Sequence, residues 1–304
     1  MQTFFVFSSD YFDILNECAY YEQVYKDLGI GIDERLFAIN GPFLMDSQFE
    51  AMKEEMRRVR KRKKPDCSAV KYSNEFTGIE RIAKAVREAG HRVGFFSNQT
   101  NRDNNRVARD AVRELLKNRI EMHKPQAIVT NEITIIGDNS YVMDDSILFQ
   151  IEMDSLAPSG LVAVWITNRE GIERDLAVHF RRWGLERIAT FYWLKVTQDG
   201  GPVCSFSEFH KVPYERFVLA SRPQSVSRYT SVSAVDGKVF ASVPMALPSR
   251  KPPVVPILRS LGVQPKWCLE LFARSLLPNT VSVGFEPLLL QSSSCLVNHE
   301  AKVS

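Results

Sequence analysis

The chain has 304 residues, of which 44% are hydrophobic and 25% charged, a composition typical of a globular protein and not of a disordered or fibrous one. A formal net charge of +3 is too small by itself to indicate a nucleic-acid partner. The five cysteines are scattered and include no Cys-x-x-Cys pair, which favours reduced thiols over a disulfide framework or a metal site. No apolar run reaches the roughly 20 residues of a membrane-spanning helix, and the first eight residues lack the basic start of a signal peptide. We therefore expect a soluble protein of the cytosol or nucleus with no membrane partner.

The first 124 residues are expected to be mostly helical, because apolar side chains recur there at helical spacing between stretches rich in charge. A short strand is expected at Arg92–Ser97, after a helix that Gly90 would close with a left-handed cap. The expected helices are Tyr11–Leu28, Ser47–Arg62, Glu75–Ala89 and Asp103–Asn118.

A cluster of basic residues lies in the second of these helices and just after it. Seven of the eight positions from 57 to 64 are basic and no acid interrupts them, so the cluster repels itself unless an anion is nearby. It indicates contact with nucleic-acid phosphates or a nuclear localisation signal, although a solvated basic helix face is the alternative. The basic residues are Arg57, Arg58, Arg60, Lys61, Arg62, Lys63 and Lys64.

From Pro125 onward, short apolar runs alternate with amphipathic helices, which indicates an α/β domain with a largely parallel sheet. Ligands bind such sheets at the carboxyl ends of the strands, so we expect function in the loops after Thr130, Ile166 and Phe272. The expected helices are Glu170–Trp183 and Pro252–Leu261. The expected strands are Ala127–Thr130, Leu161–Ile166, Ile188–Val196, Phe217–Ala220, Lys238–Val243, Cys268–Phe272 and one that starts at Val281.

Five segments of this half carry a family resemblance. They read LVAVWITN from Leu161, FYWLKVT from Phe191, HKVPYERFVLAS from His210, SVPMALPSRKPP from Ser242 and WCLELFARSLLPN from Trp267. In order and spacing they resemble the eukaryotic adenine-N6 methyltransferase family, over about Gln126 to Gln291. The resemblance implies a Rossmann-like sheet that binds S-adenosylmethionine and methylates the N6 amine of adenine in nucleic acid.

The family's catalytic motif, Asp-Pro-Pro-Trp after a strand, does not occur in this chain. An acidic group and a backbone carbonyl held by proline orient the weakly nucleophilic amine, and the aromatic ring stacks on the flipped base. After the strand that ends at Thr130, the residues at this place are Asn131, Glu132, Ile133 and Thr134. Asn131 and Glu132 are thus the candidate catalytic positions of a degenerate motif.

The resemblance also implies cofactor contacts, some kept and some lost. Lys251 occupies the place of the lysine that faces the cofactor carboxylate, and Glu270 and Arg274 match the family as well. Ser275 replaces an asparagine that contacts the ribose, and Phe285 replaces another amide. His210 and Lys211 have two interpretations: they contact nucleic acid, or they cap a turn before Pro213. Trp165, Trp183, Trp193 and Trp267 are interpreted as core or interface residues.

The resemblance assigns a methyltransferase-like domain to 125–291, while composition alone predicts a basic, mostly helical extension at 1–124 and a flexible, polar tail at 292–304. The first hypothesis is a catalytically impaired pseudo-methyltransferase, located in the nucleus, that binds DNA or RNA or supports a catalytic methyltransferase subunit. The second is an active adenine-N6 methyltransferase that uses atypical residues such as Asn131 or Glu132. A truncated product without a stable function is a third, weaker alternative.

Overall fold

The computed structural model describes residues 4–26, 29–42, 73–98, 103–122, 150–151, 153, 156–168, 171–206, 212–247, 250–284 and 297–298. The predicted helix 47–62, the basic cluster at 57–64 and the predicted strand 127–130 lie outside these residues. So do the degenerate motif at 131–134 and the pair at 210–211.

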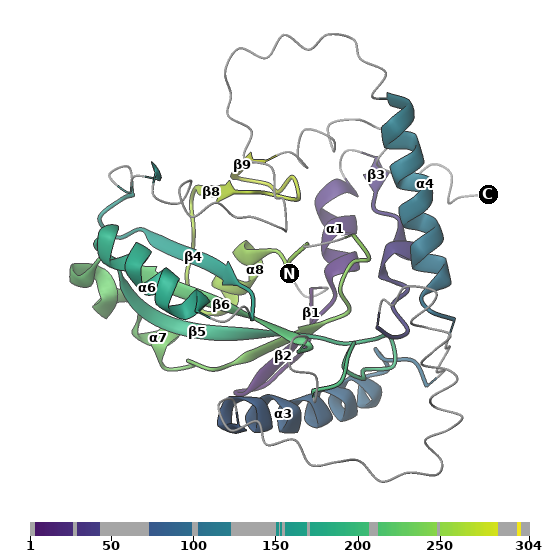
Figure 1. Cartoon of the computed structure of the whole chain (residues 1–304), viewed down its shortest axis with the longest axis horizontal. Coiled ribbons are helices and arrows are strands. Elements are labelled where there is room, and N and C mark those ends of the chain that lie inside the picture. Colours follow the sequence, from purple (N-terminus) through teal and green to yellow (C-terminus); the bar gives the residue numbers. More distant parts are fainter. Residues whose placement is uncertain are drawn as a thin grey trace.

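The centre of the described part is a six-stranded sheet with the order β1-β2-β7-β5-β6-β4 (Figure 1). β1 and β2, from the amino-terminal part, form one edge of this sheet beside β7, so the amino-terminal residues complete the sheet of the carboxyl-terminal half. The strands are β1 (Phe5–Ser8), β2 (Phe12–Leu15), β4 (Leu161–Ile166), β5 (Glu186–Lys195), β6 (Tyr214–Ser221) and β7 (Val239–Ser242).

This sheet is mixed, and not largely parallel as its sequence predicted. β2 and β5 both pair in parallel with β7, whereas the pairs β1–β2, β5–β6 and β4–β6 are antiparallel. A parallel pair needs a long crossover connection. β1 and β2 are joined by a tight turn at 9–11, and no helix is described between β5 and β6, so these neighbours run in opposite directions.

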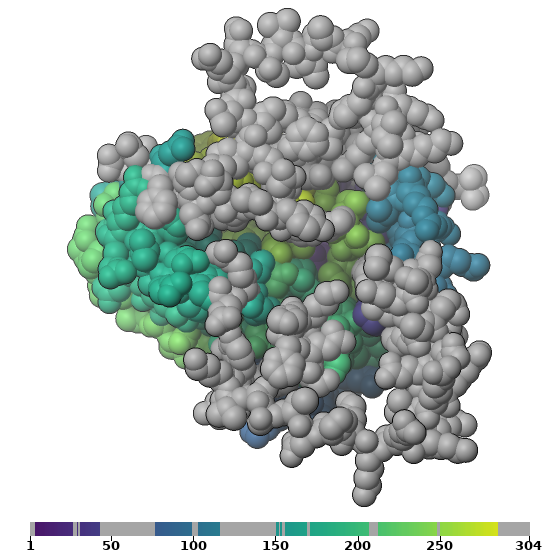
Figure 2. Space-filling model, in the orientation of Figure 1, coloured from purple at the N-terminus to yellow at the C-terminus, as the bar shows by residue number. Residues whose placement is uncertain are grey.

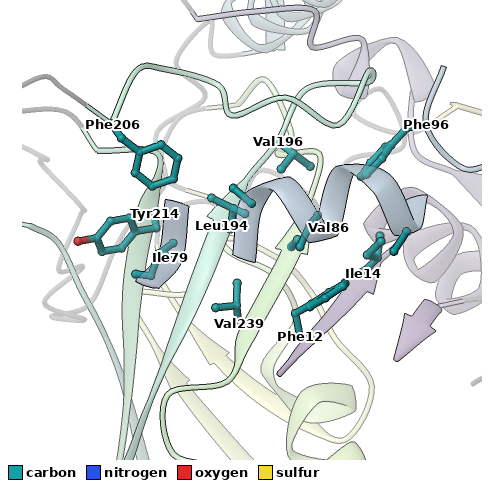
Figure 3. Close-up of a cluster of buried hydrophobic side chains, with 13 residues drawn as sticks. Phe12, Ile14, Ile79, Val86, Phe96, Leu194, Val196, Phe206, Tyr214 and Val239 are labelled. Atoms are coloured by element: carbon teal, nitrogen blue, oxygen red, sulfur yellow. The ribbon is translucent and has the colours of Figure 1, made fainter. Parts of the chain in front are cut away.

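One face of the sheet is covered by α3 (Ser73–Arg92). Ile79 and Val86 of this helix point toward Leu194 of β5, Val239 of β7 and Ile14 of β2 (Figure 3). The α6 helix (Ile172–Arg182) covers the same face over β4 and β6, where Leu176 and Phe180 bury themselves against Val218.

The opposite face is covered by short helices of the carboxyl-terminal half. Ile257 and Leu258 of α8 (Val254–Ser260) pack with Phe191, Phe217 and Phe240, which alternate with the residues that face α3. The helices η4 (Pro223–Tyr229) and α7 (Thr230–Ser233) close this side. Both faces of the sheet are therefore buried.

The remaining described elements flank the sheet. In Figure 1, α4 (Arg106–Met122) stands beside α1 (Glu17–Tyr25), and α4 also packs on η2 (Glu34–Phe37). In the space-filling view of Figure 2, the blue residues of α4 lie at the right of the molecule, and the teal residues of β4 and α6 lie at the left. Two small sheets complete the described part: β8 (Cys268–Leu271) with β9 (Thr280–Val283), and β3 (Ile30–Gly31) with β10 (Val297–Asn298).

Two local predictions were wrong in part. The segment Tyr11–Leu28 is not one helix, because β2 occupies its start and α1 begins only after Asn16, which caps the helix by accepting a hydrogen bond from the Ala19 amide at 3.0 Å. The division of the chain at residue 124 and the flexible tail at 292–304, in which β10 pairs with β3, stay predictions.

The second error concerns the end of α3. The helix runs through Gly90 to Arg92, and no strand forms at Arg92–Ser97. A Cβ atom at residue 90 would lie 2.1 Å from Cδ2 of Phe96, so Gly90 provides space for this ring instead of capping the helix. Among the described helices, none is long and apolar enough to cross a membrane.

Candidate functional site at the strand ends

Polar residues gather where β5 and β7 end and β6 begins. The strand registers place Lys195 opposite Ser242, and Trp193 opposite Glu215. Because side chains alternate along a strand, these four lie on the same face of the sheet, the one that α8 covers. The carboxyl ends of parallel strands are the usual ligand side of such sheets, so this edge is the candidate site.

Two lysines share one carboxylate at this edge. Lys195 Nζ donates to Oε1 of Glu215, and Lys251 Nζ donates to Oε2. Both ammonium groups also lie over the ring of Trp193, 4.7 Å and 5.8 Å from its centroid, where the electron-rich face attracts cations. The arrangement has two positive charges and one negative charge, so it carries a net charge of +1 that suits an anionic ligand group.

Burial and charge act against each other on this ion cluster. Burial would raise the pKa of the Glu215 carboxyl, but attraction to Lys195 and Lys251 outweighs it and holds the pKa below its usual value. Burial lowers the pKa of Lys251, although the neighbouring Glu215 opposes the effect. We therefore assign Glu215 as a carboxylate at neutral pH.

A hydrogen-bond chain connects the cluster to α1. Trp193 Nε1 donates to Ser242 Oγ at 2.7 Å, and the Ser242 hydroxyl donates in turn to Oε1 of Glu17. Trp193 and Glu17 are 1% and 3% exposed. Burial raises the pKa of Glu17 to about 7, against the hydrogen bond from Ser242 and the charge of Lys195.

A second polar group surrounds Arg250, the residue before Lys251. Nη1 of Arg250 lies 3.4 Å from Oγ of Ser275, and that hydroxyl is also 3.1 Å from the Tyr21 hydroxyl. Burial raises the pKa of Glu270, on β8, to about 7, and the charge of Arg250 opposes this rise. The loop after β8 is thus held between α1 and Arg250.

The structure brings three of the four predicted cofactor residues near one another. Lys251 belongs to the ion cluster, Ser275 hydrogen-bonds beside Arg250, and Glu270 feels the charge of Arg250. Arg274 is half-buried in the same loop. The predicted catalytic residues Asn131 and Glu132, the basic cluster at 57–64 and the pair His210 and Lys211 lie outside the described residues.

Sequence reasoning missed seven residues of this site, Ser242 and Arg250 among them. Trp193 was interpreted as core, which its burial supports, but its ring also holds two ammonium groups. A lysine at the end of a buried strand and a glutamate after the proline of HKVPYE were available signals for Lys195 and Glu215. No local signal marked Glu17 or Tyr21. Trp267, also interpreted as core or interface, is 83% exposed.

Comparison with known proteins identifies the scaffold that carries this site. Residues 126–286 match the MT-A70 family, and this segment contains β4 to β9 and therefore Lys195, Glu215, Lys251 and Ser275. The match covers more than half of the chain. The chain belongs to the MT-A70 family.

Named relatives of this MT-A70 protein agree with the match. A Caenorhabditis elegans "DNA N6-methyl methyltransferase" is 32% identical over 359 aligned positions, which cover 92% of this chain and 96% of that protein. Because 359 positions exceed the 304 residues of this chain, the alignment includes stretches of the relative without a counterpart here.

Two shorter matches cover less than half of either chain. The mouse "N(6)-adenine-specific methyltransferase METTL4" is 35% identical over 141 residues, 43% of this chain and 29% of that protein. The "N6-methyladenosine RNA methyltransferase MTA1" of Cryphonectria parasitica is 38% identical over 139 residues, 45% of this chain and 40% of that protein.

Family membership confirms two predictions from the sequence. The fold is the α/β, Rossmann-like fold of S-adenosylmethionine-dependent methyltransferases, and the family is that of the adenine-N6 methyltransferases of nucleic acid. S-adenosylmethionine is therefore the expected cofactor. It combines a carboxylate, an ammonium group and ribose hydroxyls. The candidate site fits these groups, since it combines the ammonium groups of Lys195 and Lys251 and the guanidinium of Arg250 with the carboxyls of Glu215 and Glu270.

Proposed function

We propose that this MT-A70 protein serves adenine-N6 methylation of nucleic acid as a catalytically impaired member of its family. In this proposal it binds DNA or RNA in the nucleus and supports a catalytic methyltransferase subunit. The scaffold supports a role within the methylation system, because the ion cluster of Lys195, Glu215 and Lys251 lies in the segment that matches the family. The missing catalytic motif supports the impairment.

The absence of Asp-Pro-Pro-Trp from the whole sequence is the observation on which the impairment rests. Asn131 has no acidic group, and residues 132–134 contain neither the prolines nor the aromatic ring. Without a group that accepts a hydrogen of the adenine amine, its lone pair stays delocalised into the base. Loss of stacking on the flipped base removes about 1–3 kcal/mol more.

The cofactor would lie against the candidate site at the ends of β5 and β7. Lys251 and Arg250 are the cations that would hold its carboxylate, and Glu270 is an acceptor for its ribose hydroxyls. The Ser275 hydroxyl is already engaged by Tyr21 and Arg250, so a ribose contact there would require it to change partners. We therefore expect weak cofactor binding.

An active enzyme is the alternative. It is favoured by the C. elegans relative, which is named for DNA N6 methylation and aligns along nearly its whole length with this chain. In that case a residue other than the aspartate of the missing motif would orient the amine, and Glu132 is the candidate by position.

Two measurements on the full chain separate these functions. Titration calorimetry with S-adenosylmethionine is expected to give weak binding. Transfer of labelled methyl groups to adenine oligonucleotides of DNA and RNA is expected to remain at background, with a control in which Lys251→Met abolishes the calorimetric signal. Methyl transfer above background that Glu132→Gln removes would establish the alternative.

Nucleic-acid binding is proposed for the basic cluster together with His210 and Lys211. If the cluster contacts phosphates, neutralising Arg57, Arg58, Arg60, Lys61, Arg62, Lys63 and Lys64 weakens binding and flattens its dependence on salt. Fluorescence anisotropy with labelled oligonucleotides at several salt concentrations measures both. Unchanged affinity and an unchanged salt slope would assign the cluster to another role, such as nuclear import, which the localisation of the same variant reports.

A further inference from the structure

The α1 helix presents a polar stripe to the candidate site. Glu17, Tyr21 and Tyr25 are spaced by four residues, so they lie one above another on the same face of the helix. All three side chains are buried, although each ends in a polar group. A buried polar group is stable only with a hydrogen-bond partner, so the partners of this stripe show what it holds.

The three members of the stripe bond to two strand-end segments. Glu17 accepts from the Ser242 hydroxyl at the end of β7. The Tyr21 hydroxyl lies 3.1 Å from Oγ of Ser275, and the Tyr25 hydroxyl donates to the Leu276 carbonyl at 2.8 Å, both in the loop after β8. The stripe thereby joins the ion cluster to the loop that carries the remaining cofactor candidates.

We propose that α1 is the positioning element of the site, and that Glu17, Tyr21 and Tyr25 are its positioning residues. The helix lies outside the segment 126–286 that matches the family. Through Ser242 it sets the indole of Trp193, on which both ammonium groups rest, and through Ser275 and Leu276 it holds the loop after β8. The purpose of this positioning, cofactor binding, rests on the proposed function.

Hydrogen exchange of the loop tests the positioning without any ligand. In the full chain, Tyr21→Phe and Tyr25→Phe keep the rings and remove the hydroxyls that bond to Ser275 and Leu276. The amides of residues 272–284 are expected to exchange several times faster in the double variant, because local opening no longer breaks these bonds. Tyr20→Phe is the matched control. Tyr20 lies in the same helix, and its ring packs on that of Phe4, with 5.1 Å between the ring centroids. Unchanged exchange at 272–284 would overturn the proposal.

The Glu17 end of the stripe has its own readout. Glu17→Leu removes the acceptor of the Ser242 hydroxyl, so the indole N–H signal of Trp193 is expected to shift in the proton–nitrogen spectrum. Trp183, which packs in the cluster of α6 on the opposite face of the sheet, serves as the internal reference in the same spectrum. An unshifted Trp193 signal would show that Glu17 does not act through Ser242, and would overturn that part of the proposal.

A second arm connects positioning with the cofactor. Loss of two hydrogen bonds in Tyr21→Phe/Tyr25→Phe is expected to weaken S-adenosylmethionine binding by roughly tenfold or more, while Tyr20→Phe binds as the natural chain does. Equal affinity of the double variant and the natural chain would overturn a role of α1 in cofactor binding. If the natural chain binds no cofactor at millimolar concentration, the cofactor part of the proposed function fails, and faster exchange at 272–284 still supports α1 as the positioning element.

Discussion

The buried carboxyl of Glu17 and the partly buried carboxyl of Glu270 should both affect the pH dependence of stability. Burial raises the pKa of Glu17 from 4.5 to about 7 in the folded protein. In the unfolded chain this carboxyl loses its proton near its ordinary pKa, while the folded protein still keeps it. Stability therefore falls as the pH rises from about 4.5 to about 7, and is flat above that window with respect to Glu17.

The first prediction is that Glu17→Gln removes this slope. Between pH 4.5 and 7 the natural chain should lose up to about 3 kcal/mol of unfolding free energy more than the variant, because the glutamine does not ionise. Urea denaturation at several pH values measures the difference. The pKa of Glu270 is also raised to about 7, so Glu270→Gln and the double variant separate the two contributions. Parallel curves for the natural chain and Glu17→Gln would contradict the assignment.

Asn105 is a second residue whose side chain holds distant backbone. Its Oδ1 accepts from the amides of Asn40 and Gly41 at 2.6 Å and 3.0 Å, and its Nδ2 donates to the Gly41 carbonyl at 2.8 Å. The residue is fully buried and has a φ of 57°, in the left-handed region that asparagine tolerates.

Asn105→Ala is therefore expected to lower the free energy of unfolding by about 3 kcal/mol, through lost hydrogen bonds and a strained backbone. Asn105→Gly loses the same hydrogen bonds but tolerates the positive φ, so it should be about 1 kcal/mol less destabilising than the alanine variant. Thermal and urea unfolding of both variants give the two values. If the two variants are equally stable, backbone strain at the positive φ does not contribute to the loss of stability.

At the scale of single residues, the sequence predicted site residues that lie in segments resembling the family. It did not predict residues whose partners are far away along the chain. Lys251 and Ser275 stood in segments that resemble the family, and both lie in the site. Glu17 and Ser242 are 225 positions apart, and Tyr21 and Ser275 are 254 apart. Contacts of such separation leave no periodicity in the sequence, because periodicity reports only on neighbours within one element.

The α3 helix contains two glycines whose substitution should act in opposite directions. A Cβ atom at residue 90 would lie 2.1 Å from the ring of Phe96, which is itself buried, whereas a Cβ atom at Gly78 would meet nothing within 4 Å. Alanine has a helix propensity about 1 kcal/mol better than that of glycine. The clash should outweigh this gain at residue 90 and be absent at residue 78.

We predict that Gly90→Ala lowers the melting temperature and Gly78→Ala raises it by a few degrees, as thermal unfolding followed by circular dichroism would show. The second variant is the control for helix propensity, since both residues lie in the same helix. A stabilised Gly90→Ala would mean that Phe96 leaves its position at little cost.

At the scale of elements, segments with a strong hydrophobic pattern were predicted correctly. A segment whose pattern suits both a helix and a strand was not. The strand Leu161–Ile166 has the predicted bounds, and α6 begins within two residues of its predicted start. The start of the chain was taken as helix because Phe12 and Leu15 also suit helical spacing. In the structure both are buried in β2, and long-range pairing of β2 with β7 overrides that local pattern.

At the scale of the whole molecule, the sheet depends on both ends of the chain. The alternation of strands and helices after Pro125 correctly indicated an α/β domain, but nothing in it indicated that β2 would pair with β7. Ile14 and Leu15 of β2 are fully buried, on opposite faces of the sheet, in the core clusters of α3 and α8. The part that resembles the family is therefore completed by residues outside it.

A chain without residues 1–42 should consequently fail to form a stable fold. Its β7 would become an edge strand with unpaired backbone groups, and Val239, Phe240 and Ala241 would lose their neighbours from β1, β2 and α1. We expect this variant to lose its near-ultraviolet circular dichroism and its cooperative thermal transition. A chain shortened by residues 299–304, which follow β10, is the control and should unfold as the natural chain does. If the variant lacking 1–42 instead unfolds cooperatively at a similar temperature, the part that matches the family folds without residues 1–42. In that case α1 is not needed for the fold, and it acts on the site only by packing against a domain that is already folded.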